Sequence, residues 1–93
     1  MPQSTHITRH ARRRMDQRAI PEKIVALILD FGDSRAVRNG ALTFWLSRES
    51  LRAIRHVFGR GTVRALDHFR RAYVVVASGV VVTAAFANQP RFS

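Results

Sequence analysis

Apolar residues recur at helical spacing near the start of the chain, where they predict a first helix over residues 9–19. Residues four positions apart lie on the same side of a helix. The apolar positions are Ala11, Met15 and Ala19. Thr8 is placed to cap the start of this helix, and Pro21 disfavours helical backbone at the residue before it. We therefore expect the first helix to stop at Ile20.

A second helix is predicted to begin at Pro21, with Glu22 in its first turn, where an acidic residue is favourable. Apolar residues at intervals of three and four define its buried side. They are Ile24, Leu27, Ile28 and Phe31. Because Val25 and Leu29 make a second side apolar, we expect the helix to lie between other elements. Gly32 is expected to end it as a left-handed cap.

Asn39-Gly40 is the strongest turn signal in the chain and predicts a first β-hairpin with a two-residue loop. The strands are expected at 35–38 and 41–47. This register places Val37 opposite Leu42 and gives one apolar face. That face consists of Leu42, Phe44 and Leu46. Trp45 points the other way, where it either stacks on a base or is covered by a helix of the same protein.

A second hairpin is predicted from two valine-rich runs, 73–77 and 80–86, joined by Ser78-Gly79. Their nearly continuous apolar character is typical of central strands buried on both faces. Pairing across the turn sets Val74 opposite Thr83 and Val76 opposite Val81. Thr83 is then the one hydroxyl-bearing residue inside the otherwise apolar run 80–86.

Between the hairpins, the spacing of Leu51, Ile54 and Phe58 predicts a helix over 49–58 that is closed by Gly59-Arg60-Gly61. A second short helix is marked by Val63, Leu66 and Phe69. Residues 1–8 are expected to form a short arm with Ile7 turned inward. Residues 88–93 are expected to be either a loose end or a strap across the fold. The prediction is one α+β domain spanning 1–93, in which two N-terminal helices pack on an antiparallel sheet of about four strands.

Charge changes the picture more than any other bulk property. Fifteen arginines and one lysine face six acidic residues, which gives a net charge of +10. Arginine binds phosphate through two parallel hydrogen bonds and stacks on bases, so RNA, DNA or an acidic protein is the expected partner. A GC-rich genome is an alternative explanation for the choice of arginine over lysine, but it does not explain the net charge.

Several classes of protein are disfavoured. The chain has no cysteine and therefore no disulfide or thiolate site. No apolar run approaches the roughly 20 residues that span a bilayer, and the first residues lack the order of a secretory signal. We expect a cytoplasmic protein without a membrane association. His6 and His10 have the i, i+4 spacing of zinc ligands on a helix, but no acidic cluster supplies the remaining ligands. Neither a metal nor another cofactor is therefore predicted.

Most of the usable chemistry lies on the first predicted helix. His10, Arg14 and Arg18 recur every four residues beside the apolar positions, and we call these three residues the basic stripe. Like charges on successive turns repel one another, and an anionic ligand relieves that repulsion. A solvated basic face with a cap histidine explains the same spacing.

The spacing His10-Ala11-x-x-Arg14-Met15-x-x-Arg18-x-Ile20, followed by an apolar helix, a glycine turn and paired valine-rich strands, resembles a family of small bacterial domains of unknown function. That family is similar to RelE- and BrnT-type ribonuclease toxins of the barnase–EndoU–colicin–RelE-like fold. The resemblance is best over 6–32 and 72–86, while 48–70 is longer and more basic than expected. Ala19 stands where the family usually has glycine, and Trp45 stands near an expected aromatic.

The resemblance implies a metal-independent ribonuclease toxin that an acidic antitoxin neutralises, with His10, Arg14, Arg18 and Thr83 as its catalytic positions. In such cleavage a base removes the ribose 2′-hydroxyl proton, the oxygen attacks phosphorus, and an acid protonates the leaving oxygen. Histidine does either proton transfer near neutrality, and arginines stabilise the transition state. His56 and His68 are reserve candidates for the second proton transfer. Further RNA contacts are expected from Arg12, Arg13, Trp45, Arg52, Arg55, Arg60 and Arg64.

Two other hypotheses explain the charge without catalysis. A nucleic-acid-binding module or regulator needs only the arginines and Trp45, and its binding weakens steeply with salt. A protein-interaction domain needs only an acidic partner that matches the basic surface. Cleavage of RNA that depends on His10 distinguishes the ribonuclease from both.

Overall fold

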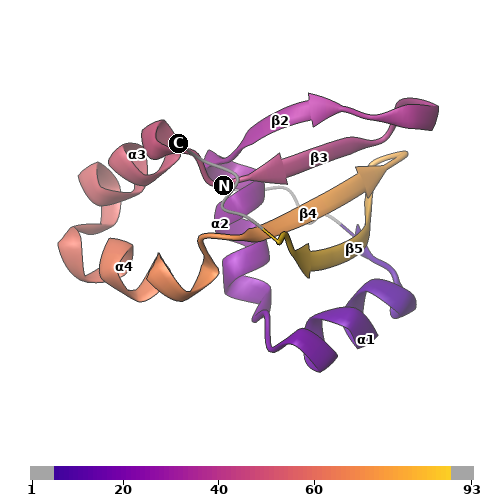
Figure 1. Cartoon of the computed structure of the whole chain (residues 1–93), viewed down its shortest axis with the longest axis horizontal. Helices are drawn as coiled ribbons and strands as arrows, with labels where there is room; N and C mark the ends of the chain where they lie inside the picture. The colour runs from indigo at the N-terminus through magenta and orange to yellow at the C-terminus, as the bar shows by residue number, and fades with distance from the viewer. Residues whose placement is uncertain (1–5, 89–93) are drawn as a thin grey trace.

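The computed structural model describes residues 6–88, which form a mixed α+β fold around one five-stranded sheet (Figure 1). The strand order is β1-β5-β4-β3-β2. The strands are β1 His6–Ile7, β2 Asp33–Ala36, β3 Leu42–Trp45, β4 Ala72–Ala77 and β5 Val80–Phe86. The helices are α1 Arg9–Arg18, α2 Glu22–Phe31, α3 Arg48–Phe58 and α4 Arg60–Ala65, with short 3₁₀ helices η1 Arg38–Gly40 and η2 Leu66–Phe69.

The sheet differs from the expected one at its β5 side. Strands β2 to β5 are antiparallel, as predicted, but β1 adds a fifth strand that runs parallel to β5. This short strand belongs to the predicted arm, and Ile7 is buried as expected. Residues 1–5 of that arm and residues 89–93 of the predicted tail lie outside the described residues.

Helix α1 confirms the first predicted helix. The Thr8 side chain caps it by accepting a hydrogen bond of 3.0 Å from the Ala11 backbone N–H. Ala11 and Met15 are buried, but Ala19 is exposed, so the last of the three predicted apolar positions does not belong to the buried side of the helix. The reason is local: Ala19 adopts a left-handed conformation, with φ 53° and ψ 47°, and ends the helix.

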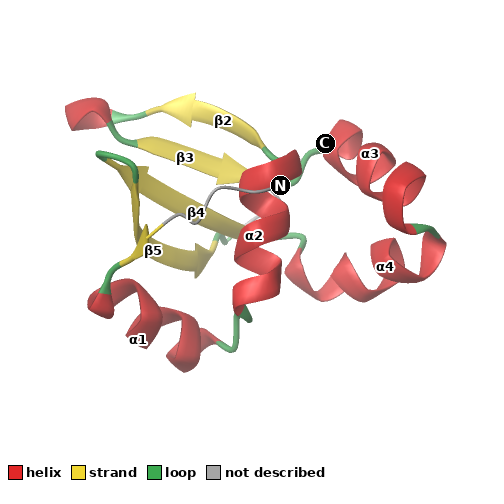
Figure 2. Cartoon of the chain, turned by 180° about the vertical axis from the view of Figure 1, so that it is seen from behind, coloured by secondary structure: helices red, strands yellow, loops and turns green. Residues whose placement is uncertain are grey.

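Helix α2 lies across one face of the sheet, which we call the inner face (Figure 2). Val25 and Ile28 are fully buried, and the other predicted positions on both apolar sides are partly buried. The expectation that α2 lies between other elements is thus confirmed, since it contacts β3, β4 and α3. Pro21 is the residue before the helix and has extended backbone, so the predicted start was one residue early.

Gly32 ends α2, but not as the predicted left-handed cap. Its φ is −74°, which any residue adopts. Glycine is needed here for space. A Cβ atom at this position would press against the Ile28 carbonyl oxygen and lie 2.6 Å from the carbonyl oxygen of Trp45. Gly32 therefore allows the end of α2 to pass directly against β3.

The first hairpin is shifted by one residue from its prediction. Asn39 and Gly40 both have positive φ, as expected for the turn, but the loop also includes Arg38. Strand β3 is shorter than predicted, β2 begins two residues earlier than predicted, and Leu42 pairs with Ala36 instead of Val37. Val37 is left outside the sheet with 43% of its surface exposed. Trp45 lies on the face opposite Leu42, as predicted.

The second hairpin contains a β-bulge that the sequence pattern did not reveal. Val76 pairs with Val81, as predicted, but Val75 pairs with Thr83, where the prediction paired Val74. The extra residue on β5 brings Val81 and Ala84 to the inner face and turns Thr83 to the other, outer face. Burial on both faces is also wrong in part, because the outer-face residue Val75 is only half-buried.

The segment between the hairpins is helical, as predicted. Ser47 and Ser50 form a reciprocal capping box at the start of α3. Gly59 alone separates α3 from α4, with φ 92° and ψ 176°, a conformation that is essentially confined to glycine. Ile54 and Leu66 join the common core. Phe58, one of the three residues whose spacing predicts this helix, has 53% of its surface exposed.

Candidate functional site

The basic stripe lies on the outside of α1 and forms no enclosed site. His10 is exposed and Arg14 is partly exposed. The Arg14 Nε donates to His10 Nε2 at 3.4 Å, and the same guanidinium reaches the Gln17 side-chain oxygen at 3.4 Å. Both distances are long for hydrogen bonds, so these exposed side chains hold one another only weakly.

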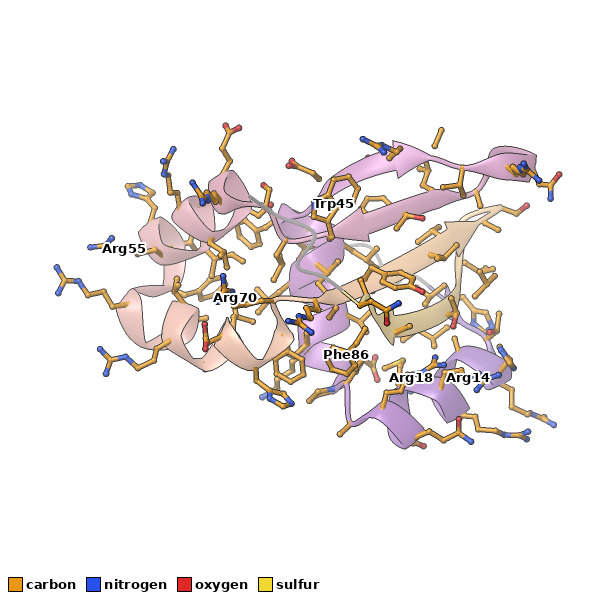
Figure 3. All side chains as sticks on the ribbon, viewed as in Figure 1. Arg14, Arg18, Trp45, Arg55, Arg70 and Phe86 are labelled. Carbon is orange, nitrogen blue, oxygen red and sulfur yellow. The ribbon has the colours of Figure 1, made fainter. Side chains whose placement is uncertain are left out.

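Arg18 has a structural partner within the fold. Its guanidinium donates a 2.9 Å hydrogen bond to the backbone carbonyl of Ala84 in β5. That carbonyl lies beyond the two residues of β5 that pair with β1. Arg18 therefore fastens α1 to the sheet, and it is less available for a phosphate than the spacing alone suggested (Figure 3).

Thr83 is not brought to the basic stripe. Had β4 and β5 paired without a bulge, Thr83 would share the inner face with Val74, where α1 packs. The bulge instead places it on the outer face beside Val75. The four predicted catalytic residues thus divide into an exposed pair, a structural arginine and a threonine on the other side of the sheet.

One arginine of α3 and both arginines of α4 gather around a concave surface. This arginine hollow has a volume of about 560 Å³ and is lined by Arg55, Arg60, Val63, Arg64 and Asp67. Gly59 explains the geometry, because a single residue with positive φ connects the two helices and lets α4 lie beside α3. Arg60 and Arg64 are one turn apart on α4, and Arg55 lies on the last turn of α3.

The charge of the arginine hollow is poorly compensated. Within residues 6–88, Arg55, Arg60 and Arg64 take part in no salt bridge. Asp67, the only acid in the lining, lies 3.8 Å from Arg70 in an exposed ion pair. An exposed pair of this kind contributes little stability. The hollow is therefore a site where three guanidinium groups face solvent together.

A second, smaller concavity adjoins the first at Asp67. This histidine hollow has a volume of about 240 Å³ and is lined by Asp67, His68, Arg70 and Arg71. The His68 ring meets the edge of Phe69 at 5.0 Å between centroids, and that of Phe86 at 6.2 Å. His68 was predicted from the sequence only as a reserve candidate, and Asp67, Arg70 and Arg71 were not predicted as site residues. Their one signal was the density of arginine between the hairpins.

The remaining predicted RNA contacts are dispersed. Arg12 pairs with Glu22 at 3.2 Å, Arg13 is exposed on α1, and Arg52 is exposed on α3 outside the arginine hollow. His56 is also exposed on α3. Trp45 is half-buried on the outer face, directly opposite Tyr73. Only part of the predicted set is therefore gathered, namely Arg55, Arg60 and Arg64.

Two basic surfaces lie at opposite ends of the molecule. Arg14 and Arg18 belong to α1 at one end, while Arg55 belongs to α3 at the other, with α2 and the sheet between them (Figure 3). Within residues 6–88, no three histidine or acidic side chains are grouped to hold a metal ion. None of the described helices is long and apolar enough to cross a membrane.

Comparison with known proteins yields no match among protein-family models, curated proteins or solved structures. Function is therefore inferred from the side chains described above.

Proposed function

We propose that this protein binds RNA through the arginine hollow. The observation that carries the proposal is that Arg55, Arg60 and Arg64, from two helices, surround one concavity whose only acid is Asp67. Guanidinium groups bind phosphate oxygens bidentately, and three of them match successive phosphates of a nucleic-acid backbone better than a single small anion. The resemblance of the sequence to ribonuclease toxins favours RNA over DNA.

Salt dependence provides a quantitative test. Each phosphate that a protein neutralises on a single strand lowers the logarithm of the binding constant by about 0.7 per tenfold rise in salt. Three contacts in the arginine hollow therefore contribute a slope of about −2. That slope corresponds to a roughly 20-fold loss of affinity between 50 and 200 mM salt.

The experiment measures fluorescence anisotropy of a labelled RNA oligonucleotide over a range of salt concentrations. Replacing Arg55, Arg60 and Arg64 together with glutamine should weaken binding at least about tenfold at low salt and flatten the slope by about two. The matched control replaces Arg9, Arg12 and Arg13 of α1 with glutamine, which removes the same charge at the other end of the molecule. If both variants lose affinity equally, binding depends on net charge and the hollow is not the site.

A second candidate function is cleavage of RNA, and the position of His68 favours it. His68 lines the histidine hollow with Arg70 and Arg71, and this hollow adjoins the arginine hollow at Asp67. A histidine beside arginines supplies what metal-independent cleavage needs. One group removes the 2′-hydroxyl proton, the oxygen displaces the 5′-oxygen from phosphorus, and an acid protonates that leaving oxygen. The products are a 2′,3′-cyclic phosphate and a 5′-hydroxyl end.

RNA incubated with the protein and a chelator separates the two functions. Cleavage lost in His68→Ala but kept in His10→Ala places the reaction in the histidine hollow, and the reverse result places it at the basic stripe. Intact RNA with the unaltered protein rejects the ribonuclease and leaves binding as the function. A toxin of this kind also implies an acidic antitoxin. Such a partner should compete with RNA for the protein and relieve any toxicity on co-expression.

A further inference from the structure

The end of α3 exposes two large apolar side chains next to the arginines. Val57 has 59% of its surface exposed and Phe58 has 53%. The Phe58 ring meets Phe31 edge-on, with 6.0 Å between centroids and 74° between the ring planes. This contact holds the ring on one side and leaves more than half of the residue in solvent.

Phe58 lies close to the cationic lining of the arginine hollow. Arg55 is three residues earlier on α3, hence on a neighbouring position of the helix surface. Arg60 begins α4 immediately after Gly59, and the Thr62 hydroxyl of α4 donates to the Phe58 carbonyl at 3.5 Å. The backbone around Phe58 is therefore held between two elements that both contribute arginines to the hollow.

Exposed aromatic rings beside a basic groove are the usual means of binding single strands. Every base has a flat face that stacks on an aromatic side chain, while arginines follow the phosphates. In a duplex the faces of the bases are already stacked on neighbouring bases, so an exposed aromatic ring finds no free base face to stack on. An unpaired base thus matches both the charge of the hollow and the apolar ring beside it.

We infer that Phe58 is a stacking platform for an unpaired base, and that the RNA bound in the arginine hollow is single-stranded. The inference rests on the proposed function and adds the strand state of the ligand. Stacking of one base on an aromatic residue contributes roughly 5- to 150-fold in affinity, as measured by removal of the ring.

The test uses a single-stranded RNA oligonucleotide that contains 2-aminopurine, and a duplex RNA of equal length. The single strand should bind at least fivefold more tightly, and its 2-aminopurine fluorescence should be quenched when the base stacks on the protein. Phe58→Leu should abolish the quenching and weaken single-strand binding at least fivefold, with duplex binding unchanged. Phe58→Tyr keeps an aromatic ring and should retain both properties. Val57→Ala is the control for loss of an exposed apolar residue.

The outcomes separate this inference from the function on which it rests. No binding of either RNA by the unaltered protein overturns the proposed function. Binding that the arginine substitutions weaken but Phe58→Leu does not change overturns the stacking role alone, as does equal binding of single strand and duplex. Thermal melting of each variant shows whether it is folded. If Phe58→Leu is unfolded, the test uses 2-aminopurine quenching by the unaltered protein and by Phe58→Tyr. Quenching by both supports the inference, and quenching by neither overturns it.

Discussion

Replacing Ala19 with glycine should make the protein more stable. Ala19 ends α1 in the left-handed conformation, with φ 53° and ψ 47°, which crowds the Cβ of any residue other than glycine. The conformation is fixed by two hydrogen bonds: Ala19 N–H donates to Asp16 at 3.3 Å, and Ile20 N–H donates to Met15 at 2.9 Å. This pattern is a Schellman motif, in which glycine is the preferred residue.

The expected gain follows from two opposing effects. Relief of the left-handed conformation contributes about 1–2 kcal/mol to the free energy of unfolding. The greater conformational freedom of glycine in the unfolded chain lowers the free energy of unfolding by about 0.4–1 kcal/mol. Because the Ala19 side chain is exposed, its loss removes no core contact. The net gain is therefore about 0.5–1 kcal/mol, which in a domain of 93 residues raises the melting temperature by roughly 2–8 °C.

Thermal melting followed by circular dichroism measures this shift. The matched control is Ala53→Gly, also an exposed alanine, but inside α3. Glycine within a helix costs about 1 kcal/mol, so the control should melt at a lower temperature. Both variants replace alanine with glycine, so opposite shifts in melting temperature would isolate the effect of backbone conformation. If Ala19→Gly melts at or below the temperature of the unaltered protein, the left-handed cap is not under strain and the reasoning fails.

Three further substitutions test the contacts that hold the fold, each by urea or thermal unfolding. Gly32→Ala should cost about 3 kcal/mol, because the added Cβ meets backbone oxygens that cannot move aside; an unchanged midpoint contradicts the close passage of α2 against β3. Arg18→Met should cost about 1 kcal/mol through the lost donor to Ala84, while Arg13→Met should change little; equal effects would mean that the hydrogen bond is unimportant. Ser47→Ala should cost about 1 kcal/mol by removing the α3 cap, and a stability unchanged from that of the unaltered protein would speak against that cap.

Local sequence signals predicted the elements well because they depend on near neighbours. Thr8, the spacing of Ala11 and Met15, and Pro21 together define α1 to within one residue at its end. The helices on both sides of Gly59 were also expected from nearby residues. Short-range periodicity and capping act within a few residues, so they can be recognised without knowledge of the tertiary structure.

Pairing between strands was predicted less well, because one inserted residue changes every later position. The bulge on β5 moves Thr83 from the inner to the outer face, and the longer loop after Ala36 leaves Val37 outside the sheet. Valine-rich runs give no signal for such a shift, since either register pairs one valine of β4 with Thr83 and the others with apolar residues. Gly32 was misread for a similar reason. Its neighbour across the fold is Trp45, which the local pattern does not identify.

The candidate site depended on both kinds of information. Arg55, Arg60 and Arg64 were recognised as basic residues, but only the fold brings them around one hollow. The basic stripe was recognised by its spacing, yet the spacing could not show that Arg18 is bonded to Ala84. Residue type thus indicated the chemistry, and the tertiary structure decided which residues could act together.

The unequal edges of the sheet limit how this protein can self-associate. On one side β1 and α1 lie along β5, and Arg18 occupies a carbonyl that a new strand would need. On the other side β2 pairs only with β3 among residues 6–88, and all four of its residues are exposed. Among residues 6–88, the sheet ends in β1, of two residues, and in β2, of four, so β2 is the longer edge for strand addition. Two copies that paired only through β2 would form a closed two-fold dimer, because that pairing uses the same edge of each copy.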